Sequence, residues 1–213
     1  MLRLSLCAAL VQLVLSAGAF ACEGQKGKVI FEENFSDDSG GWDLNASNRV
    51  ITPPDFHIVL NKDNSAFSVQ NLTFNAIDGD YCAEMKFPKS VPAKVVAQIG
   101  IVFWAADYDN YMLFLVNSEG KAAAYRKSAG KWSTIFNLPN IAAIKTGPEA
   151  SNDLQVIVKD GKIFSFVNGA MVKVFRAQTP TGAMRFGVFT GADPDVTDDL
   201  EFTVQVFRVT AGQ

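Results

Sequence analysis

The sequence predicts an all-β domain built from two packed antiparallel sheets, and three observations support this. Phe, which occurs 17 times, joins Val and Ile in short segments separated by Gly, Asn, Asp and Pro, as in the strands of a sandwich. Helical periodicity is hardly visible after residue 21. Dipeptides typical of tight hairpin turns stand between several of the segments.

Apolar and β-branched residues mark twelve candidate strands, and this number in one domain indicates two antiparallel sheets. The predicted strands are Val29–Phe35, Phe56–Leu60, Phe67–Phe74, Asp80–Phe87, Ala97–Ala105, Tyr111–Asn117, Lys121–Lys127, Leu154–Lys159, Lys162–Val167, Met171–Arg176, Met184–Thr190 and Leu200–Val209.

Turn residues predict which strands are neighbours. Asp160-Gly161 and Asn168-Gly169 each supply residues that accept positive φ, so residues 154–176 form a three-stranded meander. Residues 99–121 consist of two buried strands joined by an acidic turn, and Ser118-Glu-Gly120 leads into a third strand.

Residues 1–21 have the composition of a secretory signal peptide. Arg3 precedes an apolar stretch that ends in Ala19-Phe20-Ala21, and no later segment is apolar for long enough to cross a bilayer. We therefore expect a secreted or periplasmic protein whose residues 22–213 form a single domain. An acylated lipoprotein cysteine at Cys22 is less expected, because Phe20 is bulky for such a site.

Two cysteines remain after the expected cleavage, Cys22 and Cys82. In an oxidising compartment an isolated pair is most simply a disulfide, and the alternative is two free thiols. Closing a loop of about 60 residues would stabilise the fold by roughly 3 to 4 kcal/mol.

Charge gives little indication of a polyanionic partner. The formal net charge of −3 is small, and Lys and Arg form no run. The sequence thus lacks the electrostatic pattern expected for binding nucleic acid or an anionic membrane.

Several short motifs follow one another in a recognisable order along the chain. They are Phe31-Glu-Glu-Asn-Phe, Gly40-Gly-Trp42, Gly100-Ile-Val-Phe-Trp, Asp109-Asn-Tyr-Met-Leu-Phe, Gly130-Lys-Trp132, Asp160-Gly-Lys, Val167-Asn-Gly169 and Gly187-Val-Phe. This order resembles the concanavalin A-like lectin/glucanase superfamily, and more narrowly laminin G-like modules and bacterial exported domains described as family 16 glycoside hydrolase-like, of undefined function. The resemblance covers Val29 to Val209 and implies a jelly-roll sandwich.

Retaining glucanases of this superfamily carry Glu-x-Asp-x-x-Glu on one strand, which places the reacting carboxylates in the cleft. The sequence has no such triplet. Glu84 lies inside the predicted strand Asp80–Phe87 and is the catalytic candidate, with a second acid from the loop 193–199. The simpler interpretation is that Glu84 lies on a solvated face. The missing triplet therefore argues against an enzyme.

Calcium is the cofactor that the resemblance implies, because many jelly rolls of this superfamily tie the first strand to the last with a structural ion. Glu33, Asp199 and Glu201 would supply carboxylate oxygens, and Asp107 and Asp109 form a separate acidic cluster. Ordinary solvated acidic turns remain the alternative, and no other cofactor is expected.

Aromatic side chains are the candidate ligand contacts, because sugar rings stack on exposed Trp and Tyr. Alternation places Trp104 on the opposite face from Phe103, and Trp104, Tyr108, Tyr125 and Trp132 could line one groove. We therefore expect non-catalytic binding of a cell-envelope or extracellular glycan. The alternatives are a glycoside hydrolase or lyase of the same fold and a structural or protein-interaction module.

Overall fold

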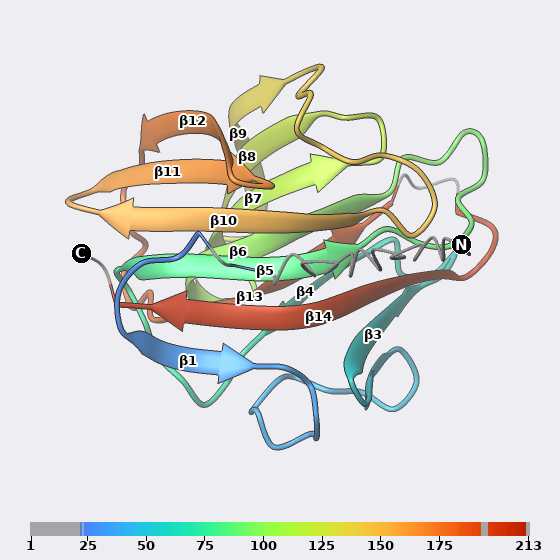
Figure 1. Ribbon diagram of the computed structural model, residues 1–213, viewed down its shortest axis with the longest axis horizontal. Coiled ribbons are helices and arrows are strands. Elements are labelled where there is room, and N and C mark those ends of the chain that lie inside the picture. Colours follow the sequence, from blue (N-terminus) through green and yellow to red (C-terminus); the bar gives the residue numbers. More distant parts are fainter. Residues whose placement is uncertain (1–21, 23, 193–195, 212–213) are drawn as a thin grey trace, which may run out of the picture.

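The computed structural model describes residues 22, 24–192 and 196–211, and in this part of the chain it contains fourteen strands and no helix. The strands form two antiparallel sheets packed face to face (Figure 1). The predicted class, a two-sheet antiparallel sandwich, is confirmed. The expected signal peptide, residues 1–21, lies outside the described residues.

The first sheet has eight strands in the order β12-β11-β10-β5-β14-β3-β2, with β1 paired to the free side of β14. Its last strand in sequence, β14, thus lies in the middle of the sheet. The bounds are β1 Val29–Glu33, β2 Arg49–Thr52, β3 Asp55–Leu60, β5 Gly79–Lys86, β10 Ser151–Lys159, β11 Lys162–Val167, β12 Ala170–Arg176 and β14 Leu200–Thr210.

The second sheet has six strands in the order β4-β13-β6-β7-β8-β9. The predicted meander of residues 154–176 corresponds to β10-β11-β12 in the first sheet, and residues 99–128 form β6-β7-β8 in the second. The bounds are β4 Ala66–Gln70, β6 Gln98–Asp107, β7 Asn110–Asn117, β8 Ala122–Ser128, β9 Lys131–Leu138 and β13 Arg185–Gly191.

The core lies between the two sheets and is rich in aromatic rings. Phe186 on β13 stacks on Phe207 on β14 with ring centroids 5.1 Å apart, which joins the two layers directly. Trp42, in the loop after β1, packs edge-on against Phe207 at 5.3 Å. Offset and edge-to-face pairs of this kind stabilise a core beyond the area they bury. The abundance of Phe in the sequence is thus largely explained by this interface.

Two strands were not predicted. The side chains of β9 are mostly exposed, so its sequence lacks the alternation of apolar and polar residues that marks a strand. β2 has only four residues, too few to show such a pattern. The predicted strand Phe67–Phe74 ends early, at Gln70, because the side chain of Asn71 accepts hydrogen bonds from the backbone N–H groups of Thr73 and Phe74 and forms a turn.

The expected outward position of Trp104 is wrong. A bulge interrupts the pairing of β6 with β7 after Phe103, and Trp104 has a φ of +49°. This departure from extended backbone breaks the alternation, and the indole turns into the core, where it is 2% exposed. Its Nε1–H donates to the carbonyl oxygen of Ile77 at 2.8 Å.

The predicted disulfide between Cys22 and Cys82 is confirmed, with the Cα atoms 5.7 Å apart. It ties the start of the described chain to the outer face of β5, and such bonds form in oxidising compartments. No helix among the described residues is long and apolar enough to cross a membrane.

Candidate functional site

A groove runs across the outer face of the six-stranded sheet, the face turned away from the main core. Its floor is a separate apolar cluster whose members are almost completely buried although they face outward. Outward-facing apolar side chains would normally be exposed, so neighbouring side chains must shield this floor. The floor residues are Val102, Leu113, Leu115, Ala123 and Phe189.

Trp132 on β9 forms a wall of the groove. It remains 48% exposed, yet it makes edge-on contacts with Tyr111, Tyr125 and Phe189 at centroid distances of 5.5, 6.1 and 6.5 Å. The ammonium of Lys127 lies 5.8 Å from the centre of the Trp132 ring. The indole therefore has fixed neighbours on its edge and a free area available for a ligand.

Three hollows of about 460, 240 and 210 Å³ follow one another along this face. Trp132 and Phe189 line both the first and the second. Leu115 and Tyr125 line both the second and the third. The hollows are thus parts of one elongated groove, a shape suited to an extended ligand.

One end of the groove is polar and is organised by Asp43, which follows Trp42 in the loop after β1. Its Oδ2 accepts a hydrogen bond from the Tyr108 hydroxyl at 2.5 Å and forms an ion pair with Nη1 of Arg49 at 2.6 Å. Burial, followed by the hydrogen bond to Asp43, raises the pKa of Tyr108 well above its usual range. The phenol therefore stays a donor to the carboxylate.

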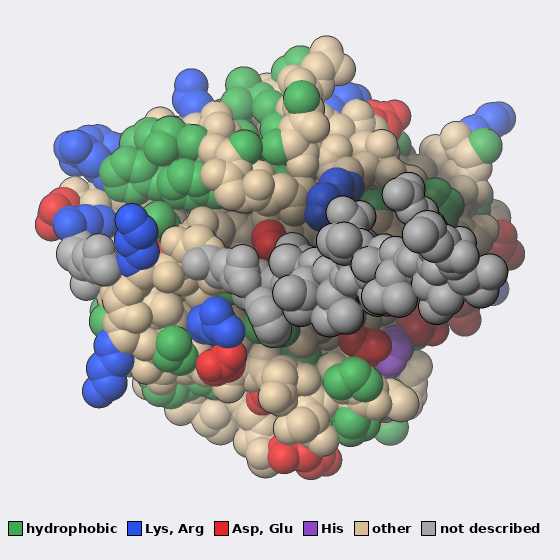
Figure 2. Space-filling view, in the orientation of Figure 1, with side chains coloured by type: hydrophobic (Ala, Val, Ile, Leu, Met, Phe, Trp, Pro, Cys, Tyr) green, Lys and Arg blue, Asp and Glu red, His purple; other side chains and the backbone are tan. Residues whose placement is uncertain are grey.

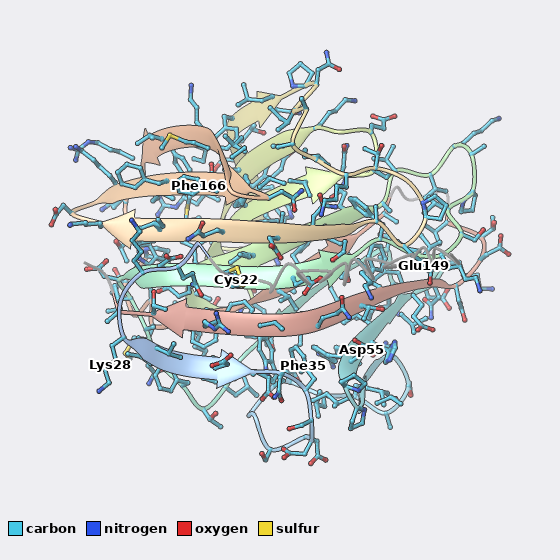
Figure 3. All side chains as sticks on the ribbon, viewed as in Figure 1. Cys22, Lys28, Phe35, Asp55, Glu149 and Phe166 are labelled. Atoms are coloured by element: carbon cyan, nitrogen blue, oxygen red, sulfur yellow. A yellow bond between two sulfur atoms is a disulfide. The ribbon has the colours of Figure 1, made fainter. Side chains whose placement is uncertain are left out.

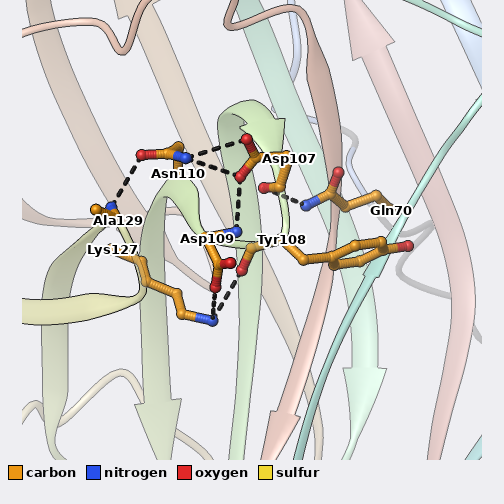
Figure 4. Close-up of polar contacts among 7 residues, drawn as sticks. All are labelled: Gln70, Asp107, Tyr108, Asp109, Asn110, Lys127 and Ala129. Carbon is orange, nitrogen blue, oxygen red and sulfur yellow. Dashed lines mark hydrogen bonds and ion pairs between the residues drawn. The ribbon is translucent and has the colours of Figure 1, made fainter.

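The turn between β6 and β7 closes this end (Figure 4). Asp107 accepts hydrogen bonds from the Asp109 backbone N–H at 2.7 Å and from the Asn110 amide, and the former is the main reason that the pKa of Asp107 is lowered. Lys127 Nζ donates to the Tyr108 carbonyl at 2.8 Å and pairs with Asp109 Oδ1 at 3.2 Å. The Asp107 carboxylate thus stabilises the turn through these hydrogen bonds, whereas Asp109 projects toward solvent.

The structure brings together three of the four predicted aromatic residues. Tyr108, Tyr125 and Trp132 all line the groove, whereas Trp104 lies in the core. Asp43, Arg49, Tyr111 and Phe189 were missed. On β7 and β8, Tyr111 pairs with Lys127 and Leu113 pairs with Tyr125. This register could have identified Tyr111 as a groove residue. Nothing in the sequence indicates that Asp43 lies beside Tyr108.

Glu84 lies in the other sheet. Its carboxylate accepts a hydrogen bond from the Ser151 hydroxyl at 2.7 Å on the outer face of β5 and β10, opposite the groove. Of its predicted partner loop, residues 193–195 lie outside the described part of the chain. Glu84 therefore shares no cleft with Asp43 or Asp109.

The residues predicted for calcium are not assembled into one site. Glu33 pairs with Phe207 on β14, and Glu201 lies six residues further along that strand, about 20 Å away at the rise of a β-strand. Glu33 Oε1 accepts the Phe35 N–H at 2.8 Å, and Glu201 contacts His57 at 2.7 Å. Among the described residues no group of three or more His, Cys, Asp and Glu could hold a metal ion.

Comparison with solved structures defines the class of fold. The chain is similar to a β-glucanase from Bacillus licheniformis (TM-score 0.61, 13% identity, 87% of this chain and 99% of that one). It is also similar to the catalytic domain of an endo-1,3-β-glucanase, a laminarinase, from Thermotoga petrophila (0.59, 10%, 86% and 97%). A third similar structure is a β-1,3-1,4-glucanase, a lichenase, derived from a mouse hindgut metagenome (0.60, 11%, 84% and 98%).

The chain has the concanavalin A-like jelly-roll fold, as the sequence resemblance implies. No protein-family model matches the sequence, and no curated protein matches it.

The expectation of a non-catalytic glycan-binding domain is contradicted by these comparisons. The three similar structures named above, each matched over nearly its whole length, are glucanases. They favour the alternative from the sequence, a glycoside hydrolase of the same fold.

Proposed function

We propose that this chain is an exported glycoside hydrolase that binds a β-glucan along the groove. The observation that carries the proposal is the Asp43 carboxylate, which two donors hold at one end of an aromatic groove. The fold likeness to β-glucanases adds support. We place the enzyme outside the cytoplasm, secreted or periplasmic, with a signal peptide cleaved after Ala21 and the single domain 22–213.

The groove suits a polysaccharide because its floor and wall are apolar and aromatic. Trp132 and Tyr125 offer ring surfaces for the C–H faces of sugar units. Gln98 and Asn137, which line the groove toward its other end, offer amides for hydroxyl groups. Several sugar units can therefore be bound at once along the three hollows.

Hydrolysis of a glycosidic bond commonly needs two carboxyl groups. In the described part of the groove the floor is apolar, and the carboxylates that line it are Asp43 at the polar end and Glu119 at the other end. We place the reaction at the polar end, where two donors hold the Asp43 carboxylate. We assign Asp43 as nucleophile or base, because Arg49 and Tyr108 both bind its Oδ2 and hold the carboxylate in place at the polar end of the groove. We assign Asp109, exposed at the turn, as the acid.

The test measures reducing ends released from laminarin and lichenan by the wild-type chain, D43N and D109N. Loss of general acid or base catalysis commonly costs about 10² to 10⁴-fold, and we expect decreases of this size in both variants. D107N and E84Q are matched controls, because Asp107 is used in the turn and Glu84 lies on the opposite sheet. They should retain activity.

Azide separates the two roles by the configuration of the product. In D43N it should replace the missing nucleophile or base, restore turnover and give a glycosyl azide whose anomeric configuration is inverted relative to the substrate, whereas a glycosyl azide formed by D109N through a glycosyl-enzyme would have the retained configuration. A wild-type chain that releases no sugar from either glucan, or active D43N and D109N proteins, would overturn the proposal.

A further inference from the structure

The outer face of the eight-stranded sheet carries a row of three cations. Lys159, Lys162 and Arg176 are directly cross-strand neighbours on β10, β11 and β12, and all three are exposed. Like charges placed opposite one another destabilise a sheet. Among the described residues, none of the three has an acidic side chain within ion-pair distance. We call these residues the cationic row.

An exposed apolar patch adjoins the cationic row. The next cross-strand positions are Ile157, Phe164 and Val174, followed by Phe166 and Met171. Met171 is 58% exposed and Val174 is 41% exposed. Figure 2 shows hydrophobic side chains gathered over β11 and β12 with Lys and Arg at their border. We call these five residues the apolar patch.

A hollow of about 370 Å³ connects the two features. It is lined by Lys26 and Lys159 together with Ile157, Phe164 and Phe166. The acid that lines it, Asp80, is 5% exposed and accepts hydrogen bonds from Nε2 of Gln155 at 2.8 Å. Asp160, in the turn between β10 and β11, is the acidic residue nearest in sequence to the row. The charge around the patch is thus predominantly positive.

The start of the described chain lies on the same face. Cys22 follows directly after the apolar residues 1–21 and is bonded to Cys82, whose cross-strand partner is Gln155, next to Phe166 on β11. Figure 3 shows Cys22 and Phe166 on the same side of the eight-stranded sheet. Cys22, the first described residue, therefore lies beside the patch.

We propose that the apolar patch and the cationic row form a docking surface for an anionic lipid membrane. Apolar side chains enter the boundary between headgroups and acyl chains, while surrounding Lys and Arg contact anionic headgroups. The combination of an apolar patch with a border of cations favours a membrane over an acidic protein, because an acidic protein would need the cations alone. The proposal is independent of the groove, which lies on the other sheet.

The test is sedimentation of residues 22–213, the chain that remains after the proposed cleavage, with vesicles of phosphatidylcholine alone or mixed equally with phosphatidylglycerol. We expect binding to the mixed vesicles only, weakened at about 1 M salt, where the Debye length is about 3 Å. Each cation near an anionic surface contributes roughly fivefold to partitioning. The variant K159Q/K162Q/R176Q should therefore bind about 100-fold more weakly.

K62Q/K89Q/K94Q is the matched control. It removes the same positive charge from exposed loops that follow the last residues of β3 and β5. It should bind vesicles much more tightly than the cationic-row variant. M171S/V174S tests the apolar part separately, and thermal unfolding checks that each variant is folded. Hydrolysis of glucans should be the same in all of them.

Three results would overturn the proposal. One is that the wild-type chain sediments with neither kind of vesicle. Another is that the cationic-row variant and its matched control bind equally. The third is that the wild-type chain forms dimers that M171S/V174S abolishes, which would assign the patch to a second copy of this chain.

Discussion

Replacement of Trp104 by alanine tests whether this side chain packs in the core or contacts a ligand. The sequence places Trp104 with Trp132 as a ligand contact, and the structure places it in the core at 2% exposure. A core residue contributes to stability, whereas a groove residue contributes to ligand binding. The variants W104A and W132A should therefore affect different measurements.

The expected loss of stability in W104A follows from its packing. Truncation of a buried Trp to Ala typically costs about 3 to 5 kcal/mol. Alanine keeps a Cβ, so the strain of the positive φ at this position is not relieved. For a domain of this size, a loss of about 4 kcal/mol lowers the melting temperature by about 8 to 16 °C. W132A removes only edge contacts and should cost about 1 to 2 kcal/mol.

W104F separates the hydrogen bond from the packing. Phenylalanine keeps an aromatic ring but lacks the Nε1–H that binds the Ile77 carbonyl. That carbonyl also accepts the Tyr81 hydroxyl at 3.0 Å, so it retains a partner, and the cost should be only about 1 to 2 kcal/mol.

Urea and thermal unfolding followed by circular dichroism measure all three variants, and affinity electrophoresis in laminarin measures ligand binding. We expect W104A to be the least stable variant and W132A to lose retardation in the gel. A W104A protein as stable as wild type, with glucan binding abolished, would refute the inward position of this side chain.

The remaining predictions concern the disulfide and one buried tyrosine. C22S/C82S, and wild-type protein under reducing conditions, should lose roughly 3 to 4 kcal/mol of stability in urea unfolding, because the bond closes a loop of about 60 residues; unchanged stability would contradict this. Burial raises the pKa of Tyr111 to about 12, against about 10 in the unfolded chain. The contribution of Tyr111 to the free energy of unfolding is therefore fully present below about pH 10, and it is lost as the pH rises to about 12. Y111F should show a shallower decline in stability over this range, and identical slopes would exclude the effect.

Strand positions could largely be predicted, because alternation and hairpin dipeptides are local signals. The turns Asp160-Gly161 and Asn168-Gly169 both lie where the sequence indicates them. The position of Trp104 could not be predicted, because a single positive φ reverses the side-chain direction and no sequence rule locates it. β9 carries mostly exposed side chains and therefore has no apolar period to recognise.

The polar end of the groove depends on contacts between distant segments. Asp43 and Tyr108 are separated by 65 positions, and only the folded chain brings them within hydrogen-bond distance. The cationic row escaped prediction for a related reason. Lys159, Lys162 and Arg176 form no run in the sequence, and cross-strand register places them next to one another.

The central place of β14 has a consequence for the order of folding. This strand pairs with β5 along one side and with β3 and β1 along the other. Before residues 200–210 are available, the eight-stranded sheet consists of two separate groups of strands, β12-β11-β10-β5 and β3-β2, and the unpaired strand β1. Their open edges invite pairing with other chains. During synthesis or export, the first sheet is therefore completed only after these residues have emerged, and a chaperone that shields β5 and β3 until then would suppress aggregation.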